Sequence, residues 1–341
     1  MAEAVRYDRY DLSIVNAKRK VKAKYSRMGS IYGLISGITF ALNSVIVGVA
    51  LAMTPLTLKA SAIVAPLVAA AMNDSMTALW LLVYNIIKGR FAEIGRTLKT
   101  FPGFMICVAA ILGGPFAMGC YLLGIQFAGS AYAMPISALC PVVGAILARI
   151  FLKQKMSLRI SLGMIICVAG CFIISITPPS GSYPHFYLGI LFSFGAAFGW
   201  GAEGMISSFG SSVVDPEVAI NIRELTSGIF DIIIVLPIIA GIGMFAQIFT
   251  APRTLIIIAG AALAGAVSFL TWYKANNMIG VAPGMALNVT YVLWGLVFSV
   301  ILTGIALTPS LIIGALACTF GAILVVMNPF AIFSRKKEEL Q

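Results

Sequence analysis

The sequence predicts an all-α integral membrane protein in which ten transmembrane helices form two five-helix repeats of opposite orientation. Three observations support this fold class. Of the 341 residues, 60% are hydrophobic and only 10% are charged, whereas a soluble domain carries about 25% charged residues. Ten apolar runs are long enough to cross a bilayer, and the second five repeat the small-residue pattern of the first five. The composition therefore excludes most classes of soluble enzyme.

The apolar runs set the boundaries of the predicted spans. A helix needs about 20 mainly apolar residues to cross the hydrocarbon with its backbone hydrogen bonds satisfied. The runs are residues 29–52, 61–87, 102–124, 130–152, 157–177, 186–208, 217–246, 254–276, 282–304 and 308–329. The first repeat is thus placed at 29–177 and the second at 186–329. The basic segment 1–28 lacks the apolar core of a signal peptide, so the first span is expected to be an uncleaved insertion signal.

Lysine and arginine residues predict the orientation, because positively charged loops stay in the cytoplasm. Eight lie in segment 1–28, four in the loop 88–101, four between positions 149 and 159, and three in the tail 330–341, against Lys59 and Arg253 on the other side. Both termini are therefore expected in the cytoplasm, with the chain in a plasma membrane, such as a bacterial inner membrane. This topology and contact with anionic lipid account for the net charge of +11, so no nucleic acid partner is expected.

Histidine and cysteine content bears on cofactors. The chain has a single histidine, His185, which excludes a histidine-rich metal site. All six cysteines lie within apolar runs, where they are typical of small packing residues rather than of disulfides. We therefore expect no metal, no cofactor and no disulfide framework.

The two halves of the chain repeat one another at an offset of 151 positions. The matching pairs are Ala110 and Ala261, Leu112 and Leu263, Gly114 and Gly265, Gly129 and Gly280, Ala131 and Ala282, Met134 and Met285, Gly144 and Gly295, Gly163 and Gly314, Cys167 and Cys318, and Gly170 and Gly321. At an offset of 150, Asn73-Asp74 aligns with Arg223-Glu224. Such a register indicates a duplicated five-span unit. Because five is odd, the second unit is inserted upside down, as in alternating-access transporters, whose substrate site lies between the halves.

These spans and their motifs resemble a known family. A Gly-x-Ala step opens the fourth span at Gly129-Ser130-Ala131 and the ninth at Gly280-Val281-Ala282, and the last helix of each half is short and rich in glycine. Over residues 29–329 this pattern resembles the drug/metabolite transporter superfamily in its ten-span EamA form. The resemblance implies transport of small metabolites, amino acids, amines or drugs, in many members by export. One departure is Phe151-Leu152-Lys153-Gln154-Lys155, where many relatives carry a glutamate.

The leading candidate for a substrate residue is Glu203 in the sixth span. A charge inside the bilayer costs at least about 2.5 kcal/mol, so each such residue is a functional candidate. Trp200 lies three residues earlier on the same helix face, and glycines flank both positions. A carboxylate beside an indole suits a cationic ligand, because the ring adds cation–π attraction. The alternative interpretation is a glutamate that ties two helices together.

The other charges inside the spans form a candidate coupling or charge network that consists of Asp74, Arg223, Glu224 and Asp231. Neighbouring residues of a helix diverge by about 100°, so Arg223 and Glu224 are expected to pair across helices rather than with each other. Alternatively, Arg223 binds a substrate carboxylate. One of the acids is a candidate site for a coupling proton, since burial favours the protonated carboxyl.

Further candidate ligands lie in the eighth and ninth spans. They are Trp272 and Tyr273, followed by Asn288, Tyr291 and Trp294, of which the last three form one stripe at helical spacing. Together with Trp200, these rings are expected to wall a cage for a quaternary ammonium group. The alternative is a belt of aromatic side chains at the membrane surface.

The sixth span carries a second, narrower resemblance. The stretch Gly199-Trp200-Gly201-Ala202-Glu203-Gly204-Met205-Ile206-Ser207-Ser208-Phe209-Gly210 resembles the choline-permease branch of the same superfamily. In that branch a sixth-span tryptophan and tyrosines of the eighth and ninth spans enclose a trimethylammonium group. The resemblance thus nominates Trp200, Tyr273, and either Tyr291 or Trp294. Where that branch adds a first-span aromatic, this chain has Asn43 and Ser44, which leaves two interpretations: an incomplete cage with Asn43 beside it, or a different amine as substrate.

These observations favour a secondary transporter for a small organic cation. The most specific candidate substrate is choline or a related quaternary amine. The alternative is an exporter of amino acids or other small metabolites or drugs, for which Arg223 and Asn288 matter more than the aromatic residues. A membrane enzyme is disfavoured, because the sequence has no HExxH pair, no second histidine and no D-x-x-D cluster inside a span. No filter-like loop indicates a channel. The absence of a Walker motif predicts that an ion gradient drives transport or that transport is facilitated.

Overall fold

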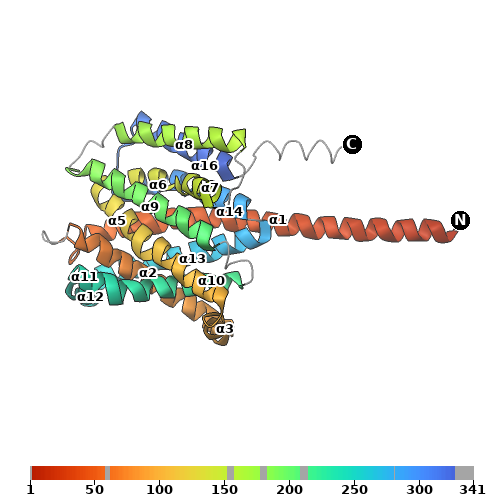
Figure 1. Cartoon of the computed structure of the whole chain (residues 1–341), viewed down its shortest axis with the longest axis horizontal. Coiled ribbons are helices and arrows are strands. Elements are labelled where there is room, and N and C mark those ends of the chain that lie inside the picture. The colour runs from red at the N-terminus through yellow and green to blue at the C-terminus, as the bar shows by residue number, and fades with distance from the viewer. Residues whose placement is uncertain are drawn as a thin grey trace.

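A computed structural model describes residues 2–57, 62–151, 157–176, 183–207, 214–279 and 281–326. All regular elements in these ranges are helices, and Figure 1 shows most of them running side by side along one axis. The predicted tail 330–341, residues 208–210 of the sixth-span motif and Gly280 of the ninth lie outside the described residues. The all-α membrane fold class is confirmed.

Eight helical stretches among the described residues are long and apolar enough to cross a membrane. They are Lys20–Leu51 within α1 (Ala2–Leu51); α2 (Val64–Ile87); Phe101–Ala128, built from α4 (Phe101–Ile111), η2 (Leu112–Phe116) and α5 (Ala117–Ala128); Ser130–Phe151, built from α6 (Ser130–Ser137) and α7 (Cys140–Phe151); α8 (Leu158–Ile176); α13 (Pro252–Ile279); Pro283–Thr303, within α14 (Val281–Asn288) and α15 (Tyr291–Thr303); and α16 (Pro309–Val326). Eight of the ten predicted spans are therefore matched by such a helix.

Helices also occupy the positions of the sixth and seventh predicted spans. The sixth corresponds to α9 (Phe186–Ser207), and the seventh begins with α10 (Pro216–Phe230) and continues through η3 (Asp231–Val235) and α11 (Leu236–Ile238). The seventh was expected to run unbroken over 217–246, but the structure ends it at a turn where Ala240 has φ 54°. A short helix, α12 (Ile242–Phe249), follows the turn, and another, α3 (Phe91–Thr97), lies in the predicted loop 88–101. The seventh span is therefore divided into short helices, and α10, its longest, carries the charged residues Glu217, Arg223 and Glu224.

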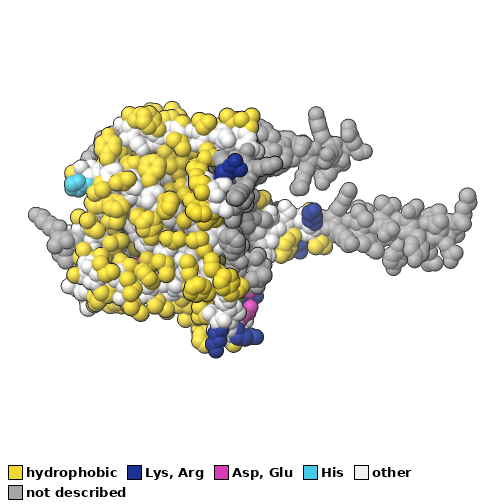
Figure 2. Space-filling view, viewed as in Figure 1, with side chains coloured by type: hydrophobic (Ala, Val, Ile, Leu, Met, Phe, Trp, Pro, Cys, Tyr) yellow, Lys and Arg dark blue, Asp and Glu magenta, His cyan; other side chains and the backbone are white. Residues whose placement is uncertain are grey.

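The surface of the bundle is apolar between two ends of different character. Large hydrophobic side chains on many helices are exposed, as lipid contact requires, and Figure 2 shows them covering the sides of the molecule. Lys88, Arg96 and Lys99 are exposed at the end that holds α3, which we call the basic end. His185 lies at the other end, which we call the opposite end (Figure 2). The orientation stays a prediction, in which the basic end faces the cytoplasm.

The packing of the helices is consistent with two inverted repeats. The pair α1 and α13 has its counterpart in α9 and α5, and α8 packs against α16. In this last pair the contacts are reciprocal. A Cβ added to Gly163 would lie 2.8 Å from the Gly321 carbonyl, and one added to Gly170 would lie 2.7 Å from the Gly314 carbonyl. Because 163 aligns with 314 and 170 with 321, such contacts are those of a local two-fold axis.

Candidate functional site

The third span is opened locally by a π-helical turn that faces the other half of the protein. This turn, η2, contains Gly113, Gly114 and Pro115, and such turns are frequent at functional sites. Both glycines provide close approach, because a Cβ at Gly113 would overlap the Glu203 carboxylate and a Cβ at Gly114 would overlap the Ser227 hydroxyl. The sequence of η2 thus lets α9 and α10 bring polar side chains into the centre of the bundle.

A buried network of charges lies next to this turn. The Arg223 Nε donates to Glu203 Oε1 at 2.8 Å, its Nη2 donates to Oε2 at 3.3 Å, and its Nη1 donates to Glu224 Oε1 at 2.5 Å. Arg223 therefore pairs with Glu203 across helices, as expected, and also with its neighbour Glu224, the pairing that the sequence favoured less. The long arginine side chain curls back to its neighbour Glu224 while also reaching Glu203. Since a buried ion costs several kcal/mol unless it is paired, the three groups stabilise one another.

A second set of polar side chains continues the network towards α1 and α2. Ser227 donates to Asp74 Oδ2 at 2.5 Å, and the Asn73 amide lies 3.4 Å from Asp74 Oδ1. Asn43 donates to Asn73 Oδ1 at 2.8 Å and to the Ala261 carbonyl at 2.6 Å. Asn43 is thereby fully engaged in joining α1 to α2 and α13.

Two carboxyl oxygens of this region are buried without a hydrogen-bond partner in the described structure. They are Oε2 of Glu224 and Oδ2 of Asp231. Asp231 opens the π-helical turn η3 and interacts electrostatically with Asp74 and Arg223. Among the described residues, two carboxyl groups thus bind Arg223, and Asp74 and Asp231 interact with it electrostatically, an excess of acidic groups that fits a site tolerating or attracting positive charge.

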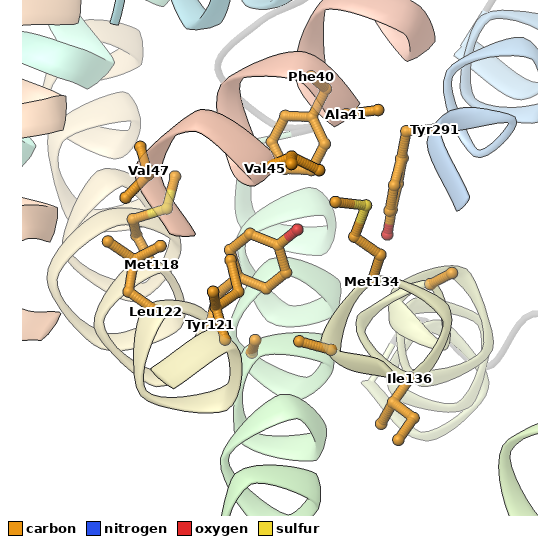
Figure 3. Close-up of a cluster of buried hydrophobic side chains, with 14 of the residues drawn as sticks. Phe40, Ala41, Val45, Val47, Met118, Tyr121, Leu122, Met134, Ile136 and Tyr291 are labelled. Atoms are coloured by element: carbon orange, nitrogen blue, oxygen red, sulfur yellow. The ribbon is translucent and has the colours of Figure 1, made fainter. Parts of the chain in front are cut away.

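Five aromatic rings from five spans meet beside the network. We call Phe40, Tyr121, Trp200, Phe269 and Tyr291 the aromatic cluster. The Phe40 ring centroid lies 4.9 Å from that of Tyr291, 5.9 Å from Trp200, 6.0 Å from Tyr121 and 6.1 Å from Phe269, and the centroids of Tyr121 and Trp200 are 5.0 Å apart. Figure 3 shows Phe40, Tyr121 and Tyr291 converging with Met134 alongside. Such a group of ring faces can bind a cation.

Hydrogen bonds fix the orientation of these rings. The Trp200 indole donates to the Gly113 carbonyl at 2.9 Å, so the π-helical turn also holds the tryptophan. Tyr121 donates to the Ser44 hydroxyl at 2.9 Å, and the hydroxyls of Tyr291 and Ser137 are 3.2 Å apart. The Arg223 guanidinium lies 5.4 Å from the Phe269 ring centroid, so Phe269 connects the aromatic cluster to the charge network.

The structure brings some of the predicted site residues together and separates others. Trp200 and Tyr291 lie in the aromatic cluster. Tyr273 packs on Trp272 with ring centroids 5.3 Å apart and interacts electrostatically with Glu203. Trp294 is 37% exposed on the surface of the bundle, and Asn288 donates to Ser36 Oγ at 2.6 Å.

Sequence reasoning missed Phe40, Tyr121 and Phe269. The first-span aromatic was sought at Asn43 and Ser44, whereas Phe40 lies one helical turn earlier and takes part in four of the ring contacts. The spacing of three residues between Phe40 and Asn43 was the available signal. It places both on one face of the helix.

The fold defines a multi-pass helical membrane protein in which buried charges and aromatic rings meet at the centre of the bundle. Residues 27–176 and 187–327 each match the model of the EamA-like transporter family. The chain belongs to this family of membrane transporters, within the drug/metabolite transporter superfamily.

A curated protein and a solved structure illustrate further similarities. The chain is 27% identical over 190 residues to Protein LicB of Haemophilus influenzae (strain ATCC 51907 / DSM 11121 / KW20 / Rd). The matched region covers 55% of this chain and 63% of LicB, which is less than two thirds of that relative. A solved crystal structure superposes with a TM-score of 0.56, over 90% of this chain and 98% of the other, at 14% sequence identity. That likeness supports the fold.

Proposed function

We propose that this protein is a secondary transporter that moves choline or a related quaternary amine across the plasma membrane by alternating access, with both termini in the cytoplasm. The observation that carries the proposal is the aromatic cluster, which adjoins a network rich in carboxyl groups. Quaternary ammonium groups are bound by the faces of Trp, Tyr and Phe, with up to about 2 kcal/mol per interaction when water is excluded. Trp200 and Tyr291 are the proposed ligands, and Phe40 and Tyr121 complete the cage.

Charge supports a cation over an anion at this site. Arg223 already donates to both Glu203 and Glu224, so a substrate carboxylate would have to displace one of them. A cation at the rings instead lies near Glu203, because the Glu203 carboxylate and the Trp200 indole both lie against Gly113. In the present structure the rings contact one another, so the ligand has to separate them to enter. Weaker candidates for direct contact are Trp272 and Tyr273, whose described ring contact is with each other, the partly exposed Trp294, and Asn288, which is bonded to Ser36.

The carboxyl groups also support a coupling proton. Four of them cannot all be ionised around one guanidinium without a large desolvation penalty, so at least one holds a proton. Asp231 is the proposed carrier, because one of its oxygens is buried and unpaired and because, unlike Glu224, it forms no ion pair with Arg223 in the described structure. In proteoliposomes, an imposed pH gradient is expected to accelerate labelled choline uptake, and Asp231→Asn is expected to transport choline without responding to the gradient. Equal uptake by the wild-type protein with and without the gradient would contradict this coupling.

The substrate assignment is tested by thermal unfolding of the purified protein in detergent. The panel comprises choline, tetramethylammonium, betaine, a primary amine and several amino acids. Because a ligand that binds only the folded state stabilises it by RT ln(1 + [L]/Kd), choline at 100 times its Kd is expected to add about 2.7 kcal/mol and raise the Tm. Betaine, which adds a carboxylate to the same ammonium group, is expected to bind more weakly.

The same ligand panel distinguishes the quaternary amine from the alternative substrates, amino acids and other metabolites. Stabilisation by amino acids without any effect of choline would overturn the quaternary amine and favour a metabolite exporter that uses Arg223. A response to tetramethylammonium equal to that of choline would show that the rings recognise the ammonium group alone.

A further inference from the structure

The fourth and ninth spans contact each other closely at the opposite end of the bundle. Here α6 packs against α15, and the Met134 sulfur occupies a notch at Gly295, where an added Cβ would overlap it. The hydroxyls of Ser130 and Ser299 are 3.0 Å apart in the same interface, and Ser137 lies 3.2 Å from the Tyr291 hydroxyl. Figure 3 shows Met134 and Tyr291 side by side at the edge of the aromatic cluster.

The internal repeat predicts an equivalent contact at the basic end. At the offset of 151, Met134 corresponds to Met285 and Gly295 to Gly144. The equivalent contact is therefore Met285 of α14 against Gly144 of α7. In the structure this contact is not made: a Cβ added to Gly144 would have only the Gly201 carbonyl oxygen, at 3.5 Å, and the Gly201 Cα, at 3.9 Å, within 4 Å.

A second pair of positions shows the same asymmetry. Ser137 and Tyr291 correspond to Asn288 and Cys140. Ser137 and Tyr291 are hydrogen-bonded, whereas the Asn288 amide donates to Ser36 on α1 at 2.6 Å. The difference is local, because the reciprocal contacts of α8 with α16 obey the two-fold relation.

We propose that Met134–Gly295 and Met285–Gly144 are the two alternative gates of this transporter, and that the structure is closed at the opposite end and open at the basic end. When the basic end closes, Met285 enters the notch at Gly144 while Met134 leaves Gly295. The proposal rests on the transporter assignment and not on the identity of the substrate. It names the residues that alternate around the aromatic cluster.

The chemistry of the two gates suits such an exchange. Each joins a flexible thioether to a glycine, so when one gate opens, the other forms an interaction of the same kind. The Ser130–Ser299 hydrogen bond has no such equivalent, because positions 281 and 148 are Val and Ala. The opposite-end gate is therefore the stronger of the two, which agrees with the state in the structure.

Rates of disulfide cross-linking report how often each gate is closed, and the measurement needs no substrate. In a full-length background in which the native cysteines are replaced, one variant carries Ser130→Cys with Ser299→Cys and a second carries Gly144→Cys with Met285→Cys. The first pair is expected to cross-link rapidly with an oxidant. The second is expected to cross-link at least about tenfold more slowly, because it reports a minor state. Either disulfide is expected to stop uptake, and a reductant is expected to restore it.

Matched glycine substitutions shift the equilibrium in opposite directions. Gly295→Ala blocks the Met134 notch and is expected to accelerate cross-linking of the basic-end pair by about tenfold. If Gly295→Ala folds poorly, Met134→Ala replaces it in the experiment, because Met134→Ala removes the same interaction without introducing a clash. Gly144→Ala meets nothing closer than 3.5 Å in this state, so its Tm is expected to be unchanged while choline uptake falls.

Two results would overturn the gate assignment. One is a basic-end pair that cross-links as fast as the opposite-end pair, and the other is a basic-end pair that stays unlinked in both Gly295→Ala and Met134→Ala. Failure of the choline assignment looks different, because the cross-linking rates then keep the expected order while choline changes neither Tm nor uptake.

Discussion

Arg223→Met is expected to destabilise the protein more than any other single change considered. The substitution leaves Glu203 and Glu224 in the centre of the bundle without their shared cation, and breaking a buried ion pair in this way costs about 3–5 kcal/mol. The expected result is a large fall in Tm and in the yield of monodisperse protein. Thermal unfolding of the purified variant in detergent measures it.

Arg90→Met is the matched control. Arg90 also pairs with two carboxylates, Asp215 at 3.0 Å and Glu217 at 2.5 Å, but its side chain is 32% exposed at the basic end. Such pairs are worth about 1 kcal/mol or less, so the control is expected to unfold near the wild-type Tm. The double variant Arg223→Met with Glu203→Gln is expected to recover part of the missing stability. Equal stability of Arg223→Met and Arg90→Met would show that the central network contributes little.

Trp200→Ala is expected to remove most of the stabilisation by choline. The indole contacts both Phe40 and Tyr121 and is oriented by the Gly113 carbonyl, so its removal opens the cage and frees the neighbouring rings. Removing a tryptophan cation–π interaction of about 2 kcal/mol corresponds to a roughly 30-fold weaker Kd. Ligand-dependent thermal shifts measure this change, with Trp200→Phe expected to keep intermediate affinity.

Trp294→Ala tests the choice between Tyr291 and Trp294, which the sequence left open. Trp294 is one helical turn from Tyr291 but 37% exposed on the lipid-facing surface, so the variant is expected to bind choline like the wild-type protein. Loss of binding in Trp294→Ala with binding retained in Trp200→Ala would place the ligand outside the aromatic cluster.

The helices were predictable because long apolar runs have few other stable forms in a membrane. The charged residues inside them were predictable as a set for the same reason. The partners of these residues were not predictable. Glu203 and Trp200 stood out in the sixth span. Nothing in the sequence, however, indicated that Gly113 makes room for Glu203 or that the Gly113 carbonyl accepts a hydrogen bond from Trp200. Partners of this kind depend on helix rotation and on the π-helical turn, which hydropathy does not report. Phe40 was missed because an aromatic residue in an apolar span resembles its neighbours until its contacts are known.

The reciprocal glycines of α8 and α16 affect how the two halves of the gene can diverge. Gly163 approaches the backbone of Gly321, and Gly170 approaches that of Gly314, so each glycine makes room for the opposite copy. A larger side chain in either copy pushes both helices apart, and no smaller residue exists with which the other copy could compensate. Selection therefore acts on the pair, and neither copy can drift alone along this seam. At positions 130 and 281, by contrast, the copies have separated into Ser and Val.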